Sequence, residues 1–333
     1  MSVRGADATG IGPARRRTVS SFPCRRDART RYEDVLMCVN RYLSRIDRNR
    51  TCLFDPRRSA GMRAFRIAYD GRPFHGFQRQ PDVATVADAL LSALRELDVP
   101  LEGDTPPGYA AAGRTDASVS ALAQTVAFEA PEWLSPAAFN SALPAHVRAW
   151  ACADVPDGFH ATHDAVERGY TYALYAPEVD RSRARDGARL LAGERDFHNL
   201  TPDETGTVRD LAVGVERDGP FLEIAFRADG FARQLVRRLV TLLEAFARGE
   251  ADRDRIERVL GPEPLDGPEG IAPSPPEPLV LTEVVYPDVT FRVDDEAAAS
   301  ARTVFGQRHE QSRSRARVAR SIRDGVAADI ADQ

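Results

Sequence analysis

The sequence predicts an α+β protein with a central sheet flanked by helices. Segments with the two-residue alternation of β-strands are interleaved with segments whose apolar residues recur every three or four positions, as in α-helices. Several strands end in tight turns, at Asp70-Gly71 and at Asp218-Gly219-Pro220, instead of leading into long crossover helices. Tight turns join antiparallel strands, so this order favours an α+β sheet over a doubly wound parallel sheet.

The folded part is predicted to begin with a half-buried strand, since Phe65, Ile67 and Tyr69 alternate with small or polar residues. A helix is expected next, because the apolar positions over 86–97 repeat at three- and four-residue steps and Thr85 is placed to cap them. The remaining predicted elements of this half are a strand over 122–128, a helix over 136–143 and a strand over 147–155.

The second half resembles the first. Tyr170, Tyr172 and Leu174 share one face of a strand predicted over 166–175. The further predicted elements are a helix over 182–191, a hairpin over 207–228, a helix over 231–248 and a last strand over 279–286. The chain is therefore expected to divide into an extension (1–61), two similar halves (62–160 and 161–290) and a polar, Ala- and Arg-rich helical tail (291–333).

Charge is distributed unevenly along the 333 residues. The net charge is −5, but residues 1–61 hold 14 arginines and 6 acids, a net of +8, which leaves −13 for the rest. An RNA-binding arm is one interpretation of the extension. The other, which the composition favours, is an unfolded segment or an extension translated from a start upstream of a true first residue, Met62.

All 45 basic residues are arginine. Together with the acidic body, this indicates a GC-rich genome and a salt-loving host. Because binding to phosphate by counterion release weakens as salt rises, a nucleic-acid enzyme in such a host would depend on local clusters of arginine.

Several function classes have no support in the sequence. No segment resembles a membrane-spanning helix or a secretory signal, so the expected location is cytoplasmic. The cysteines and histidines lack the spacing of a metal site; His160 and His163 are better explained as a solvated pair. A P-loop is impossible without lysine. We therefore expect neither a metal nor a cofactor.

One polar cluster, Gly113-Arg114-Thr115-Asp116, lies between two runs of small residues. Small neighbours let the backbone pack closely around an acid, and a nearby arginine can keep a partly desolvated carboxyl group ionised. An activated carboxylate is one interpretation. On the pattern alone, an ordinary aspartate that caps a turn is favoured.

The segment from Gly113 to Ala121 resembles the signature loop of the TruA family of tRNA pseudouridine synthases, in which the aspartate is catalytic. Further motifs of this family occur in its order and spacing across 62–287. They are Tyr69-Asp70-Gly71 with the segment from Phe74 to Gln80, Phe159-His160-Ala161, the Arg-x-Tyr-x-Tyr strand from Arg168 to Tyr172, Asp196-Phe197, the segment from Gly230 to Arg238, and the strand from Leu279 to Pro287.

This resemblance implies the pseudouridine synthase fold, a mixed and mostly antiparallel sheet whose two halves enclose the active-site cleft. It implies that Asp116 is the catalytic carboxylate, that Arg237 keeps it charged, that Tyr170 stacks on the flipped base and that Arg114 contacts the nucleotide or the RNA backbone. The tyrosine hydroxyl could also serve in deprotonation at C5. The arginines expected to contact RNA are Arg72, Arg79, Arg168, Arg233 and Arg238.

The resemblance also implies a homodimer that clamps tRNA and isomerises uridines at positions 38 to 40 of the anticodon stem-loop, without a cofactor. Ser118 and Ser120 depart from the family pattern, which usually has glycine and often has histidine there. If the first position requires a positive φ, serine costs on the order of 1 kcal/mol.

Three alternatives stay open. The protein could be a non-catalytic RNA-binding or chaperone protein on the same fold, or a synthase that acts at another RNA position. It could also be a nucleosidase, although no second carboxylate is evident near Asp116 in the sequence.

Overall fold

The computed structural model describes residues 61–265 and 270–331, so the predictions for residues 1–60 lie outside the described residues. One ten-stranded sheet runs through the molecule. Its strands are β1 (Gly61–Tyr69), β2 (Ala110–Ala111), β3 (Ser120–Ala130), β4 (Val147–Asp154), β5 (Glu167–Tyr175), β6 (Gly193–Asp196), β7 (Val208–Asp218), β8 (Phe221–Ala228), β9 (Leu279–Val285) and β10 (Arg292–Val293).

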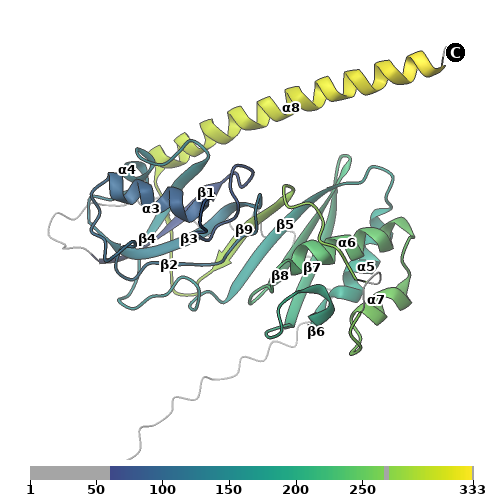
Figure 1. Cartoon of the computed structure of the whole chain (residues 1–333), viewed down its shortest axis with the longest axis horizontal. Helices are drawn as coiled ribbons and strands as arrows, with labels where there is room; N and C mark the ends of the chain where they lie inside the picture. The colour runs from purple at the N-terminus through teal and green to yellow at the C-terminus, as the bar shows by residue number, and fades with distance from the viewer. Residues whose placement is uncertain (1–60, 266–269, 332–333) are drawn as a thin grey trace, which may run out of the picture.

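The strand order is β10-β4-β1-β3-β9-β5-β8-β7-β6, and β2 pairs with β3 (Figure 1). The β3–β9 pair is parallel, and the other pairs of named strands are antiparallel. This confirms the predicted α+β class with a mixed, mostly antiparallel sheet.

The first strand is more buried than its alternation predicted. Both neighbours of β1 are strands, and Arg66 and Ala68 are buried together with Ile67 and Tyr69. The strand is therefore central in the sheet, and the side chains on both of its faces are covered, as Phe291 covers Arg66. Sequence alternation could not show this, because the polar position, Arg66, is satisfied internally by bonds to the carbonyl oxygens of Ala123 and Val284.

Two helices lie over the first half, α3 (Val86–Glu96) and α4 (Pro136–Asn140) (Figure 1). The predicted cap of α3 is present, since the Thr85 side chain accepts a hydrogen bond from the Asp88 N–H. Leu90 and Leu94 are fully buried, as their spacing predicted. The apolar face of α3 thus contributes to the core of this half.

The second half carries α5 (Arg181–Leu191), α6 (Leu235–Arg248) and α7 (Arg253–Val259). The hairpin turns at Gly219-Pro220, as predicted. The helix predicted from Phe231 begins four residues later, because Gln234 adopts a left-handed conformation with φ of 61°. The prediction omitted α7, which Asp252 caps.

The strand β9 joins the halves although it comes last among the long strands. It pairs with β3 on one side, where Ser120 faces Val280, and with β5 on the other, where Tyr170 faces Leu281. Two apolar cores form, one in each half. Tyr170 packs against both, so it lies at their junction.

The tail forms α8 (Asp295–Ala331), preceded by β10 at the edge of the sheet. Its first turns pack on the body, where Ala297 and Ala301 are buried. The rest of α8 extends past the sheet (Figure 1). Among the described residues, no helix combines the length and the apolar character that crossing a bilayer requires.

Candidate active site

Asp116 lies in the loop that connects β2 to β3, at the junction of the two cores. The loop turns tightly, since the Val119 N–H donates to the Asp116 carbonyl oxygen at 3.2 Å. The Val119 side chain is buried in the core of the second half, whereas Ala121, two residues later, belongs to the first core. The carboxylate is therefore attached to both halves of the sheet.

Two glycines of the segment after β1 leave room for this loop. A Cβ atom at Gly71 would collide with the Val119 carbonyl, and one at Gly76, where φ is +106°, would lie 3.0 Å from the Thr115 carbonyl oxygen. The backbones are also bonded directly: the Phe77 N–H donates to Thr115 O at 3.1 Å. The glycines permit a close approach that any side chain would block.

A buried hydrogen bond fixes the residue before Asp116. The Tyr69 hydroxyl and the Thr115 hydroxyl lie 2.8 Å apart, and both residues are buried. Burial raises the pKa of Tyr69 well above its ordinary value, so this phenol stays neutral. Gln124 adds a bond from its side-chain N–H to Gly113 O at 2.8 Å. The sequence assigns no separate role to Thr115 or Gln124, because the burial of these two side chains is not visible in a sequence pattern.

Arg237, in the first turn of α6, reaches Asp116. Its Nη1 lies 3.3 Å from Oδ2, and the side chains of Arg237 and Asp116 are 13% and 31% exposed. The Arg237 Nε–H donates to the Ser274 carbonyl oxygen at 2.6 Å, and the Ser274 N–H donates back to Arg237 O at 3.1 Å. The guanidinium is thus held by the loop before β9 as well as by Asp116. The sequence offered no signal for Ser274.

Tyr170 lies on β5, beside the aspartate. Its ring meets that of Phe231 edge to face, with centroids 5.2 Å apart. Burial, and to a lesser extent the negative charge of Asp116, raises the pKa of Tyr170 to about 12. The Tyr170 hydroxyl is a neutral phenol at neutral pH, and it has no hydrogen-bond partner among the described residues.

The remaining predicted arginines fall into three groups. Arg114 is exposed and has no ion pair within the described part of the chain. Exposed or half-exposed guanidiniums that pair with acids form the second group: Arg72 with Asp70, Arg79 with Asp88 and Asp104, and Arg233 with Asp203.

In the third group, the guanidinium bonds to the protein backbone. Arg168 donates to the carbonyl oxygens of Ala112, Thr162, Ala165 and Asp229, which occupies all its donors. Arg238 donates to Ile271 O and to the Gln234 side chain. Arg233 also lies outside α6, contrary to its predicted place on that helix, since its N–H donates to Asp203 and the helix begins only after Gln234.

The two residues of the loop that depart from the family pattern, Ser118 and Ser120, have distinct structural roles. Ser118 has φ of +64°, the left-handed conformation expected of that position. The Ser120 Oγ accepts a hydrogen bond from the Gly71 N–H at 3.0 Å. Ser120 therefore ties the loop to the segment after β1.

No group of three or more His, Cys, Asp or Glu side chains is arranged to hold a metal ion in the part of the chain that the structure describes. The rings of His160 and His163 lie 4.1 Å apart, and both residues are exposed. The groups brought together at the site are the carboxylate of Asp116, the guanidinium of Arg237 and the neutral phenol of Tyr170. Such a set can supply a nucleophile or a base, compensate its charge and offer an aromatic surface.

Known proteins resemble this chain closely. Residues 188–287 match the family model described as tRNA pseudouridine synthase. Two curated proteins named tRNA pseudouridine synthase A are similar to this chain. The relative from Haloarcula marismortui is 58% identical over 80% of this chain and 100% of its own length. The relative from Natronomonas pharaonis is 60% identical over 78% of this chain and 98% of its own length. A relative in Methanosarcina acetivorans is 39% identical over 74% of this chain and 92% of its own length.

A solved Cbf5-Nop10-Gar1 complex aligns with a TM-score of 0.29 and 12% identity, over 66% of this chain and 58% of the other, too weakly to carry an argument. The matched family and relatives define the class of protein as a pseudouridine synthase, an isomerase. The chain belongs to the tRNA pseudouridine synthase A family, and relatives from halophilic archaea agree with the host expected from its composition.

Proposed function

We propose that this protein isomerises uridine to pseudouridine at positions 38 to 40 of the anticodon stem-loop of tRNA, with Asp116 as the catalytic carboxylate. The observation that carries the proposal is the ion pair between Asp116 and Arg237, at the junction of the two halves. Family membership supports tRNA as the substrate. The stem-loop position rests on the resemblance of the loop from Gly113 to Ala121.

Uridine and pseudouridine are isomers, so the reaction consumes no co-substrate. The bond from ribose C1′ to N1 breaks, a bond from C1′ to C5 forms, N1 gains a proton and C5 loses one. No electrons are transferred to or from the molecule. The enzyme must supply a reactive group and hold the detached base.

Asp116 suits each of three routes: attack on C1′, attack on C6 of the ring, or assistance in forming a glycal. In every route the carboxylate must be charged and partly shielded from water. Arg237 supplies the compensating positive charge at 3.3 Å, and Ser274 keeps it in place.

Tyr170 offers a ring for stacking on a base that has left the RNA helix. Since its pKa is about 12, its hydroxyl would meet the base as a hydrogen-bond donor. Uptake of the C5 proton by Tyr170 would require the tyrosinate form. Arg114 is exposed in the same loop, which supports its proposed contact with the nucleotide. Arg72, Arg79 and Arg233 are the exposed candidates for RNA contacts, whereas Arg168 and Arg238 support the backbone. We also propose a homodimer, on the resemblance alone.

The decisive experiment measures tritium release from tRNA labelled at C5 of uridine, with the wild type, Asp116→Asn and Asp157→Asn. We expect Asp116→Asn to lose activity at least about a thousandfold while tRNA binding is kept. Asp157, exposed in a turn, is the matched control and should retain activity. Binding without release by the wild type would support a non-catalytic RNA-binding protein.

Two further measurements separate the remaining alternatives. Mapping of modified uridines in host tRNA that lacks this protein identifies the position, so a loss elsewhere than 38 to 40 supports a synthase of another specificity. Accumulation of free uracil would support a nucleosidase.

A further inference from the structure

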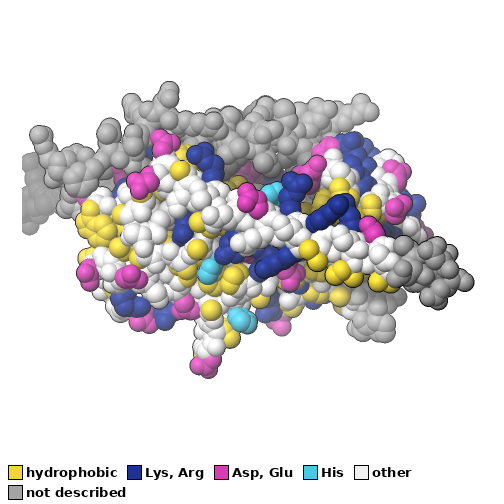
Figure 2. Space-filling view, turned by 90° about the horizontal axis from the view of Figure 1, so that it is seen from above, with side chains coloured by type: hydrophobic (Ala, Val, Ile, Leu, Met, Phe, Trp, Pro, Cys, Tyr) yellow, Lys and Arg dark blue, Asp and Glu magenta, His cyan; other side chains and the backbone are white. Residues whose placement is uncertain are grey.

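The outer part of α8 is exposed and rich in arginine. Every described residue from His309 to Val326 is exposed. From Arg308 to Arg323 this segment carries six arginines and one acid, Glu310, in a body whose net charge is −13. Figure 2 shows these basic side chains along α8, on the face seen from above. In an acidic chain, such a local concentration of guanidiniums suits a polyanionic partner.

One face of this segment lines an open pocket against the body, with a volume of about 340 Å³. The loop after β1 contributes Asp70, Arg72 and Pro73, and α8 contributes Arg308, Gln311, Ser312 and Arg315. The four helical positions recur at three- and four-residue steps, so they form one face of α8.

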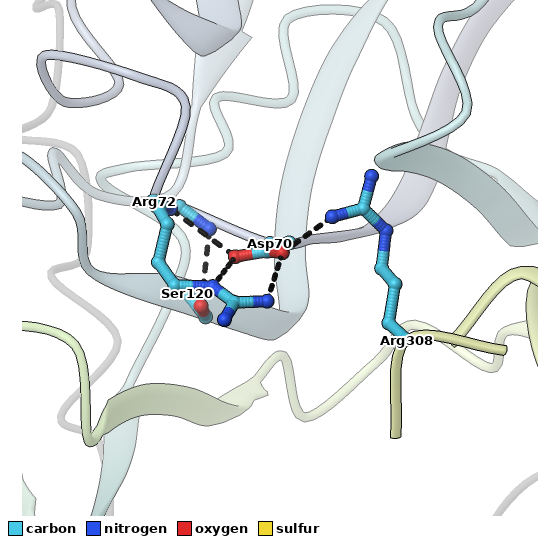
Figure 3. Close-up of polar contacts among 5 residues, drawn as sticks. Asp70, Arg72, Ser120 and Arg308 are labelled. Atoms are coloured by element: carbon cyan, nitrogen blue, oxygen red, sulfur yellow. Dashed lines mark hydrogen bonds and ion pairs between the residues drawn. The ribbon is translucent and has the colours of Figure 1, made fainter. Parts of the chain in front are cut away.

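Three guanidiniums and one carboxylate line this pocket. Arg72 donates to Asp70 through Nε at 2.9 Å and Nη2 at 2.7 Å, and Arg308 donates through Nη1 at 2.6 Å (Figure 3). Burial acts to raise the pKa of Asp70, but the bonds and charges of Arg72 and the charge of Arg308 outweigh it and lower this pKa. Asp70 is therefore an anion, and the pocket has a net charge of about +2.

Arg315 is the arginine of this pocket that no ion pair engages within the described residues. Asp70 holds the other two guanidiniums in position before any ligand arrives. An anion would therefore meet donors whose conformational entropy is already reduced. The hydroxyl of Ser312 and the amide of Gln311 add neutral donors. These groups suit a phosphate, which accepts several hydrogen bonds at once.

The pocket adjoins the catalytic loop. Asp70 precedes Gly71, whose N–H donates to the Ser120 hydroxyl at 3.0 Å and whose Cα lies so near Val119 that a Cβ would collide with the Val119 carbonyl. Val119 in turn donates to the Asp116 carbonyl oxygen. A ligand in the pocket would therefore contact the same short segment that shapes the loop around Asp116.

We propose that the pocket formed by Arg72, Arg308 and Arg315 binds a phosphate of the tRNA backbone, away from the nucleotide that reacts. This inference rests on the proposed function, because it takes tRNA as the ligand. In concentrated salt, long-range attraction is screened within a few ångströms. A preformed pocket of arginines then supplies the local contact that an acidic body cannot.

The test compares Arg315→Gln with Arg317→Gln. Arg317 is equally exposed and lies two residues further, on the opposite face of α8, so it loses the same charge without touching the pocket. Binding of unmodified tRNA is measured over a series of salt concentrations, and tritium release is measured at saturating tRNA.

We expect Arg315→Gln to weaken tRNA binding about three- to tenfold at low salt and to reduce the slope of log K against log salt by about 0.7 to 0.9, the value of one phosphate contact. Arg317→Gln should change both quantities much less and should keep the kcat of the wild type. Equal effects of the two substitutions would overturn the proposal, whatever the wild type does in the release assay.

Competition with inorganic phosphate and sedimentation of the free protein complete the test. If phosphate binds the wild type but not Arg315→Gln while both bind tRNA equally, the pocket takes a small free anion and the proposal is wrong. If Arg315→Gln instead changes the oligomeric state, the pocket is a contact between copies, and the proposal is equally wrong. Weaker tRNA binding by Arg315→Gln in a protein that releases no tritium would keep this proposal and remove the catalytic one.

Discussion

Arg237 and Asp116 are 121 residues apart in the chain, yet Nη1 of the arginine lies 3.3 Å from Oδ2 of the aspartate. The same guanidinium bonds through Nε to the carbonyl oxygen of Ser274. Three separate segments therefore meet at one guanidinium: the loop before β3, the first turn of α6 and the loop before β9. The charge beside the carboxylate is held in place from two sides before RNA binds.

Replacing Arg237 should slow the reaction more than it weakens binding. We expect Arg237→Gln to lower kcat about 10- to 100-fold, because a hydrogen bond to a charged group is worth about 1.5 to 3 kcal/mol. Arg237→Lys should recover part of this loss, since it restores the charge but not the bond to Ser274. Single-turnover tritium release and tRNA binding measure the two effects. A loss confined to tRNA binding would contradict the role proposed for Arg237.

The hydroxyl and the ring of Tyr170 should be separable. Tyr170→Phe removes the donor and is expected to lower kcat about tenfold or more with little change in tRNA binding. Tyr170→Ala also removes the stacking surface, which is worth about 1 to 3 kcal/mol per base, so it should weaken binding as well. Identical behaviour of the two variants in both assays would show that the ring has no part in holding the base.

Tyr170 should titrate at alkaline pH only. Its pKa is raised from 10.0 to about 12, so the folded state keeps the proton between these values while the unfolded state loses it. Its contribution to stability is therefore complete below pH 10 and is lost as the pH rises toward about 12. The tyrosinate absorbance of the wild type minus Tyr170→Phe should be absent at pH 10. A difference that develops around pH 10 would show that this phenol is not desolvated.

Glycine at position 118 should be tolerated. Ser118 has φ of +64°, which glycine adopts without steric cost, although glycine also gains entropy in the unfolded chain. We expect Ser118→Gly to change the free energy of unfolding by at most about 1 kcal/mol, in the stabilising direction, and to retain activity. Ser118→Val, which is β-branched, should be destabilising by at least about 1 kcal/mol. Denaturant unfolding measures both.

Alanine at Gly71 should disturb the loop that carries Asp116. Its Cβ would collide with the backbone of Val119, which lies three residues after Asp116. We expect Gly71→Ala to cost about 2 kcal/mol or more in stability and to lower activity by displacing the loop. Gly113→Ala is the matched control, because a Cβ at Gly113 meets no atom within 4 Å. Equal stability of the two variants would show that the contact at Gly71 relaxes without cost.

Local features predicted most elements of the fold. The Thr85 cap, the alternation over β5 and the turn at Gly219-Pro220 depend on residues close in sequence, and they are confirmed. The predicted start of α6 is wrong, because the left-handed conformation of Gln234 interrupts an otherwise helical pattern. The burial of both faces of β1 was missed, since it depends on segments distant in the sequence that cover those faces, such as Phe291 over Arg66.

The same distinction between local and long-range features applies to the candidate site. The motif around Asp116 and the positive φ at Ser118 could be recognised within one short segment. Donors that look alike in the sequence differ by their surroundings: Arg168 is occupied by carbonyl oxygens, whereas Arg114 is exposed. No sequence pattern distinguishes the two, because the backbone groups that engage Arg168 come from segments up to 61 residues away.

The sequence by itself determined the α+β class, the carboxylate loop and its resemblance to one enzyme family, because periodicity, turn residues and short motifs are local properties. The tertiary structure decided which charges meet. It placed β9 between β3 and β5, brought Arg237 and Ser274 to Asp116, and returned Arg308 of α8 to Asp70, 238 residues earlier in the chain. Such contacts follow from the order of strands in the sheet, which is settled by packing of the whole chain.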